Sequence, residues 1–192
     1  MPFSTDVNWP QGLLDIFNDQ NALIESRYYG PYDRLLNYAV IEGSFTFFVA
    51  PQTASHETSP RDTIEFVVFM VVLNQEQKPV LIAEIKDDRW ANKPDKRQRA
   101  DAQMRQRFDQ MLPNCAIPRL YGLSLLGTSL RVYCGDKVTG EVTPHFVGRP
   151  NVDRILPPNF LERQWDFNIL SPDGLRKIQE IVAYIKVEAA KV

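Results

Sequence analysis

The stretch Pro79-Val80-Leu81-Ile82-Ala83-Glu84-Ile85-Lys86 decides the fold that the sequence predicts. Residues 80–85 are almost wholly apolar, which is typical of a strand buried on both faces. Glu84 and Lys86 stand two residues apart, so their side chains are expected on the same face of that strand. A buried carboxylate or ammonium costs several kcal/mol unless it is paired, hydrogen-bonded or bound to an ion. The end of this strand is therefore the candidate site for chemistry.

A second apolar run, 63–73, precedes this strand and carries one internal acid, Glu65. The connector between the two runs is short and polar, so they are predicted to form a β-hairpin. Folding the first run back brings Glu65 to the same end of the sheet as Glu84 and Lys86. Two carboxylates and one ammonium are thus expected at one end of a sheet.

The rest of the chain mixes helical and strand patterns, which predicts a single α/β domain over residues 1–192 with its core at about 20–188. We expect a mixed central sheet flanked by helices on both sides. Gly30 and Pro31 are expected to break or kink the helical pattern around them, and Ser171 to cap the last helix. Helices are predicted over 10–17, 20–29, 32–41, 95–111 and 172–188, and strands over 43–51, 120–126, 130–133 and 142–147.

The helix predicted over 95–111 is the one clearly basic feature of the sequence. Its buried stripe is predicted to consist of Ala100, Met104, Phe108 and Met111, at spacings of three and four residues. Its other faces are expected to carry Lys96, Arg97, Arg99, Arg105 and Arg107. Two interpretations are open: a solvated helix face, or a groove that contacts phosphates.

Composition limits the classes of function. With 44% hydrophobic residues, 192 residues are enough for one well-buried core. The formal net charge of -2 gives no global basic field, which counts against a non-specific DNA coat protein but not against a nuclease with local contacts and a bound metal. Cys115 and Cys134 are predicted to be buried free thiols. No signal peptide and no apolar run long enough to span a bilayer are visible, so we expect an intracellular protein that does not associate with a membrane.

Several short motifs give the sequence a family resemblance. Glu84 and Lys86 end an apolar strand as Glu-x-Lys, with an acid on the strand before and a helix after, and this pattern resembles the PD-(D/E)xK nuclease superfamily. The wider pattern resembles fungal proteins with PD-(D/E)xK nuclease-like domains. The motifs that carry the resemblance are 25–32 (Glu-Ser-Arg-Tyr-Tyr-Gly-Pro-Tyr), 64–66 (Ile-Glu-Phe), 83–86 (Ala-Glu-Ile-Lys), 102–105 (Ala-Gln-Met-Arg) and 118–124 (Pro-Arg-Leu-Tyr-Gly-Leu-Ser).

The resemblance implies a restriction-endonuclease-like fold and a nuclease that uses Mg²⁺ or Mn²⁺ to hydrolyse phosphodiester bonds of nucleic acid. Mg²⁺ takes oxygen ligands and needs only one or two carboxylates from the protein. Glu65, Glu84 and the carbonyl of Ile85 would be those ligands. Lys86 would then orient the attacking water or stabilise the developing charge. The family more usually has aspartate in place of Glu65, and proline in place of Ile64.

Two further residues gain a candidate role only from the resemblance. Glu25 is either a solvated glutamate or an acid that completes the metal site from the first core helix. Gln103 is either a polar packing residue or a residue near the active site. Asp62 is an alternative to Glu65 as the acid of the first strand, because the sequence does not fix the hairpin register.

A function of a different class is also open. A catalytically inactive descendant with the same fold would bind nucleic acid or a protein without cleaving it. The two hypotheses differ in their response to metal, because a ligand that binds only the folded state raises its apparent stability.

Overall fold

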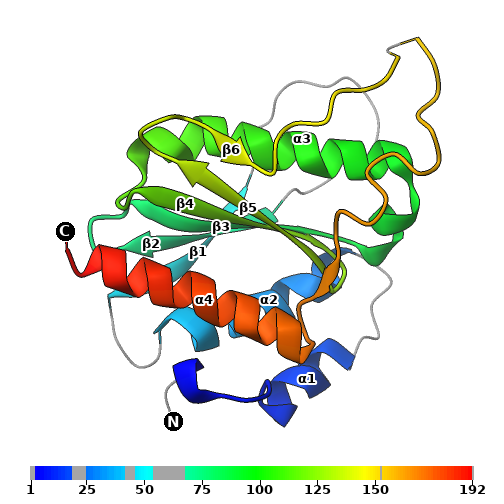
Figure 1. The fold of residues 1–192 in the computed structure, drawn as a ribbon. Coiled ribbons are helices and arrows are strands. Elements are labelled where there is room, and N and C mark those ends of the chain that lie inside the picture. Colours follow the sequence, from blue (N-terminus) through cyan, green and yellow to red (C-terminus); the bar gives the residue numbers. More distant parts are fainter. Residues whose placement is uncertain (1–2, 19–24, 42–45, 54–67, 152, 192) are drawn as a thin grey trace.

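The computed structural model describes residues 3–18, 25–41, 46–53, 68–151 and 153–191. Within them, seven strands form one mixed sheet in the order β1-β2-β3-β4-β5-β6, with β7 also paired to β5 (Figure 1). β3 and β4 are parallel and every other pair is antiparallel. The strands are β1 (Phe47–Thr53), β2 (Val68–Asn74), β3 (Pro79–Lys86), β4 (Arg119–Leu126), β5 (Ser129–Asp136), β6 (Val142–Thr143) and β7 (Phe167–Asn168).

The predicted hairpin is confirmed for the described part of its first strand. β2 and β3 are antiparallel, with Phe69 opposite Glu84. Asn74 organises the turn between them, because its side-chain carbonyl accepts from the backbone N–H of Lys78 at 2.9 Å. All eight residues of β3 are buried, which fits a central strand covered on both faces.

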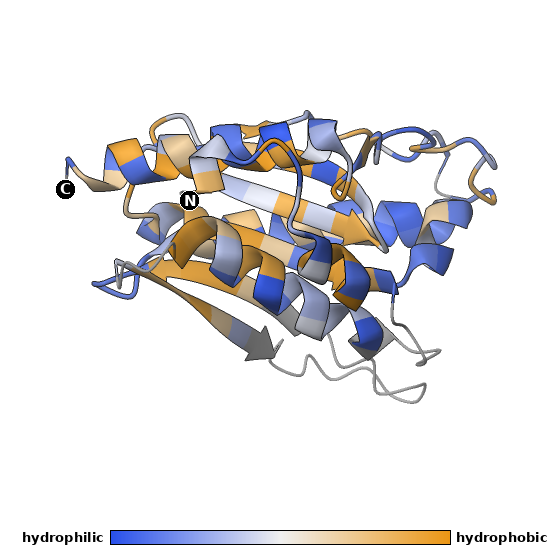
Figure 2. Cartoon of the chain, turned by 90° about the horizontal axis from the view of Figure 1, so that it is seen from below, coloured by the Kyte–Doolittle hydropathy of each residue, from blue (hydrophilic) through white to orange (hydrophobic). Residues whose placement is uncertain are grey.

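Helices cover both faces of the sheet, as expected for the α/β class: α3 lies on one face, and α2 and α4 lie on the other (Figure 1). In the hydropathy view the helices carry hydrophobic beside hydrophilic residues, as amphipathic helices on a sheet do (Figure 2). The α-helices are α1 (Gln11–Asn18), α2 (Tyr29–Leu36), α3 (Pro94–Met111) and α4 (Pro172–Ala189). Shorter helical turns are η1 (Phe3–Thr5), η2 (Glu25–Tyr28), η3 (Asn37–Ile41), η4 (Asp88–Asn92) and η5 (Leu112–Asn114).

Gly30 and Pro31 do not break a helix in the way that the sequence predicts. The 3₁₀ turn η2 ends at Tyr28, and α2 begins at Tyr29 and runs through both residues. Pro31 falls in the first turn of α2, where backbone N–H groups have no intrahelical partner and the missing donor of proline costs nothing. The predicted start of α4 is confirmed, since the Ser171 hydroxyl accepts from the backbone N–H of Gly174 at 3.1 Å.

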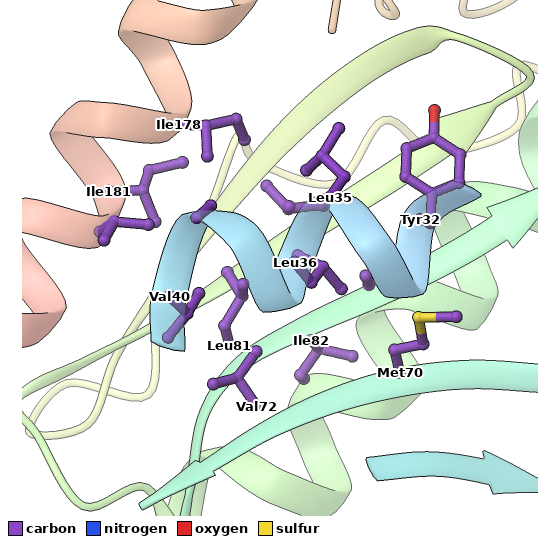
Figure 3. Close-up of a cluster of buried hydrophobic side chains, with 14 of the residues drawn as sticks. Tyr32, Leu35, Leu36, Val40, Met70, Val72, Leu81, Ile82, Ile178 and Ile181 are labelled. Atoms are coloured by element: carbon purple, nitrogen blue, oxygen red, sulfur yellow. The ribbon is translucent and has the colours of Figure 1, made fainter. Parts of the chain in front are cut away.

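The core between the sheet and the α2–α4 layer is continuous (Figure 3). Tyr32 is completely buried, and its hydroxyl donates to the carbonyl of Gly127 at 2.6 Å, which ties α2 to the β4–β5 turn. The labelled residues of this core come from α2, η3, β2, β3 and α4: Leu35, Leu36, Val40, Met70, Val72, Leu81, Ile178 and Ile181.

On the other face α3 approaches the sheet closely. Phe108 sits over two glycines: a Cβ added to Gly122 or Gly135 would lie 2.7 Å from its ring. Ala100 and Met104 are fully buried as predicted, but Met111 is only half-buried, so the buried stripe is shorter than expected.

A long irregular segment, 144–166 with residue 152 not described, crosses the α3 side of the molecule and is called the strap below. It replaces most of the strand predicted over 142–147, because β6 ends at Thr143 and Pro144 has no N–H for a ladder. Its buried side chains form a second apolar cluster with Trp90, Ala100 and Leu126: Leu156, Phe160, Leu161 and Trp165. Among the described helices, none is long and apolar enough to cross a bilayer.

Candidate functional site

Glu84 and Lys86 lie at the end of the central strand β3, on the face that α3 covers. Both are buried, with 0% and 1% of their surfaces exposed. Lys86 Nζ lies 3.0 Å from Glu84 Oε1, so the pair that the sequence placed on one face is in contact. A carboxylate and an ammonium therefore share a space from which bulk water is excluded.

A second cation reaches Glu84 from α3. Arg107 Nε lies 3.3 Å from Glu84 Oε2, and Arg107 is itself buried. The helical pattern predicted Arg107 on an outer face of this helix, and that prediction is wrong. The side chain is buried because a carboxylate on β3 and the amide oxygen of Gln110, 3.3 Å from Arg107 Nη1, supply acceptors there. Charge-assisted hydrogen bonds make such burial tolerable.

The two oxygens of Glu84 differ. Oε2 accepts the hydrogen bond from Arg107, whereas Oε1 is buried and has no hydrogen bond, although the Lys86 ammonium is close. The carboxylate thus retains an oxygen that can take another ligand. This donor fits the oxygen-only preference of Mg²⁺ or Mn²⁺.

Gln103 lies on α3 one turn before Arg107, and residues four apart share a helix face. Its Oε1 is buried without a hydrogen-bond partner. The amide is therefore on the side of α3 that faces Glu84.

The other predicted metal ligands are only partly described. Glu65 and its alternative Asp62 lie outside the described residues. Glu25 opens η2, but its side chain is also outside the description. Ile85 is buried in β3 opposite Leu125 of β4. Across the described ranges, no three His, Cys, Asp or Glu side chains gather closely enough to hold a metal ion.

Asp87 adds a further buried charge, and it was not among the candidate residues predicted from the sequence. It follows Lys86 directly, is 3% exposed, and caps η4 by accepting from the backbone N–H of Arg89 at 2.9 Å. Burial favours its neutral form, but the hydrogen bonds from the Arg89 side chain and backbone outweigh burial and lower the pKa of Asp87. An acid placed immediately after a buried strand was the signal that could have identified it.

The ring of Trp90, in η4, lies close to three cationic side chains, one from β3 and two from α3. Lys86 Nζ, Lys96 Nζ and Arg99 Cζ lie 5.1, 4.8 and 5.8 Å from the centre of its ring, within the range of cation–π contacts. The first turns of α3 therefore bring positive charge to the end of the sheet where Lys86 lies.

Other arginines of α3 serve the fold instead of a phosphate groove. Arg97 is buried and donates to three backbone carbonyls, those of Ala91 in η4 and of Pro158 and Phe160 in the strap. Arg105 is hydrogen-bonded to the Asp101 carboxylate and to the carbonyl of Pro144. The expectation that all five basic residues of this helix face outward is wrong for Arg97 and Arg107.

A second buried polar cluster lies beside the first and was not anticipated. Asp101 accepts from Arg131 Nη1 at 3.0 Å and from the Tyr133 hydroxyl at 2.8 Å. Burial, with the Asp101 charge next, raises the pKa of Tyr133 well above its ordinary value. Ser124 stands in register between Glu84 and Arg131, so the two clusters belong to one polar row across the sheet.

The comparisons with known proteins add no relative to this description. No protein-family model matches the sequence, and neither a curated protein nor a solved structure matches it. The functional interpretation therefore depends on the geometry of the site.

Proposed function

We propose that the protein is a metal-dependent nuclease of the PD-(D/E)xK type that hydrolyses phosphodiester bonds of nucleic acid. One observation carries the proposal: Glu84 and Lys86 are buried together at the end of the central strand of an α/β sheet. The strand is the second strand of an antiparallel hairpin and leads through α3 to the parallel strand β4. Burying an ion pair here costs desolvation free energy, and an apolar pair would avoid that cost. A role of the two charges in function explains why they are present.

The proposed metal is Mg²⁺ or Mn²⁺, held by Glu84, the carbonyl of Ile85 and Glu65, with Asp62 as the alternative acid and Glu25 as a further ligand. When bound, such an ion supplies a nucleophilic water and neutralises charge on the phosphate. The Lys86 ammonium would lie beside the reacting phosphate and stabilise the negative charge that develops there. Gln103 would support this arrangement from α3 without taking part in the reaction.

Nucleic acid is the proposed partner because positive charge gathers near the site. Lys96 and Arg99 lie around Trp90 together with Lys86, in a chain whose net charge is -2. Local contacts of this kind bind phosphates without a globally basic protein. The proposal includes an intracellular location, cytoplasmic or nuclear; the unpaired thiols of Cys115 and Cys134 are compatible with its reducing environment.

The test is cleavage of single- and double-stranded DNA and RNA with Mg²⁺, Mn²⁺ or a chelator. Wild-type protein should cleave at least one substrate, and only with metal. Glu84→Gln and Lys86→Met should each reduce cleavage at least about 100-fold, a loss of about 2.7 kcal/mol of transition-state stabilisation. Glu141→Gln, at an exposed position after β5, is the matched control and should cleave normally. Metal-independent cleavage, or cleavage that survives Glu84→Gln, would contradict the proposal.

The second candidate function is a catalytically inactive nuclease-like fold that binds nucleic acid or a protein. It is favoured by the contacts of Glu84, whose carboxylate already has two cations, Lys86 and Arg107, against it. Such neutralisation weakens attraction for a divalent ion. Thermal unfolding with and without Mn²⁺ separates the candidates: a metal site raises the midpoint in wild type but not in Glu84→Gln, whereas the binding module shows no rise in either.

A further inference from the structure

A hollow on the described surface lies under the C-terminal end of α3, beside the start of β3. Its volume is about 680 Å³, within the range of small-molecule sites. Val71 and Leu73 of β2 form part of its wall, and Met111 of α3 forms another part. At this wall the β2–β3 ladder shifts register between Val72 and Leu73, and Met111 is only half-buried.

The hollow lies at the Pro79 end of β3, whereas Glu84 and Lys86 lie at the other end of that strand. Val71 is the strand partner of Ile82, which stands two residues before Glu84, or about 7 Å along β3. Gln110, another lining residue, accepts from the same Arg107 guanidinium that holds Glu84. Gln110 and Arg107 therefore link the hollow to Glu84.

The charges of the lining are all positive among the described residues. Lys78 and Lys137 line the hollow, and no aspartate or glutamate does. Lys137 Nζ donates to the carbonyl of Cys115 at 2.7 Å and has no carboxylate partner within the described chain, so two of its three donors remain. Lys78 is paired with Glu76 in an exposed contact of the kind that contributes little. A ligand with an anionic group would complement the positive charge of this lining.

The neutral part of the lining combines apolar surface with amides. Gln77, Gln110 and Asn114 present side-chain amides beside Met111 and Pro113; the Gln110 oxygen already accepts from Arg107, and the other two amides offer both donors and an acceptor. A fatty acid would leave these amides unused. A nucleobase has flat apolar faces and an edge of donors and acceptors that Asn and Gln side chains can match.

We propose that this hollow binds one nucleotide unit, with its phosphate at Lys137 and its base among the amides. The inference goes beyond the proposed nuclease function, and its test does not require cleavage. The chemical class is a nucleoside monophosphate, free or as a residue of a strand.

The test uses protein labelled at the methionine methyl groups and titrated with AMP, GMP, CMP and UMP. Met111 reports on the hollow, while Met104, fully buried under α3, is an internal reference. At least one nucleotide should shift Met111 saturably and leave Met104 in place. The corresponding nucleoside and inorganic phosphate should each bind at least about tenfold more weakly, because each lacks half of the contacts.

Variants locate the binding. Lys137→Met should weaken the nucleotide about tenfold with the nucleoside unchanged, whereas Lys177→Met on α4 should change neither. The inference is overturned if no nucleotide shifts Met111, if nucleoside and nucleotide bind equally, or if octanoate binds while nucleotides do not. Glu84→Gln keeps the nucleotide site but abolishes cleavage, so this inference and the nuclease proposal fail independently.

Discussion

Glu84 is a carboxylate without contact to bulk water, and its charge is balanced by contacts from two different elements. Lys86 supplies one contact from the same strand, and Arg107 supplies the other from α3. Buried ion pairs contribute little relative to apolar residues, but removing one partner leaves the other charge uncompensated. The site is therefore sensitive to the loss of Arg107, a residue that would not itself contact the substrate.

Arg107→Gln should destabilise the fold by about 1–3 kcal/mol, less than the loss of an only partner, because Lys86 remains beside Glu84. The double variant Arg107→Gln/Glu84→Gln should recover part of this loss, since it removes the unpaired charge as well. Urea unfolding of the four members of this cycle measures the coupling. Strictly additive effects would mean that the contact between Glu84 and Arg107 carries no energy.

Asp87 gives the chain a predictable response to acid. Its pKa is lowered in the folded state, so the stability that it contributes is present above the ordinary carboxyl pKa of about 4 and is lost as pH falls through the lower folded value. Asp87→Asn should therefore flatten the fall of the melting temperature below about pH 4. The exposed Asp166→Asn is the matched control. Superimposable acid slopes for wild type and Asp87→Asn would contradict the assignment.

At the scale of elements, α3 unites the fold and the site. It covers the β3–β4 pair, its Phe108 packs against Gly122 and Gly135, and its arginines bind Glu84, Asp101 and the strap. The spacing of α3 from the sheet thus sets the distance between Arg107 and Glu84. Glycines under the helix control that spacing.

Gly122→Ala should lower the free energy of unfolding by about 1–3 kcal/mol, because the new Cβ would lie 2.7 Å from Phe108 and 2.8 Å from Met104. Gly12→Ala is the control: nothing lies within 4 Å of a Cβ there, and alanine favours a helix by about 0.5–1 kcal/mol. Chemical denaturation should show opposite signs for the two variants. Equal effects would show that α3 can move away from the sheet without loss.

The sequence predicts the elements of this fold well and the burial of its charges badly. Apolar periodicity was sufficient for the β2–β3 hairpin, for α3 and for α4, and the two-residue spacing placed Glu84 and Lys86 on one face. Arginine, by contrast, has no sequence signal for burial. Arg97 is buried because carbonyls of the strap, about 60 residues later, accept from it.

The same limit applied to the site. The burial and the hydrogen bonds of a charged side chain depend on elements that are distant in sequence, and no local sequence pattern predicts them. Examples are Arg107 and Arg131. The length of a short edge strand was equally hard to predict: the strand predicted over 142–147 is the two-residue β6. Glu65 and Asp62 lie in 54–67, outside the described residues, so their roles as metal ligands remain predictions.

For the whole molecule, the distribution of charge matters more than its sum. The net charge is -2, yet Lys96 and Arg99 gather around Trp90 at the end of the sheet that holds Lys86. Arg97 and Arg107 donate their hydrogen bonds inward. Any contact between α3 and phosphates therefore falls to its exposed and half-exposed cations, and Arg99 is the most suitable for a test.

Arg99→Glu should weaken nucleic-acid binding and reduce the slope of log K against log salt concentration by about one, because the variant releases about one counterion fewer per complex. Arg176→Glu, the same charge reversal at an exposed position of α4 on the opposite layer, should leave that slope close to the wild-type value. Because both variants change the net charge equally, a difference between them can come only from where the charge lies. Fluorescence anisotropy with a labelled oligonucleotide between about 50 and 200 mM salt covers the range in which such slopes are measured. If the two variants lose affinity equally, long-range repulsion explains the effect and α3 is a solvated face; if only Arg99→Glu loses it, the nucleic acid lies against the end of the sheet where Lys86 and Glu84 meet.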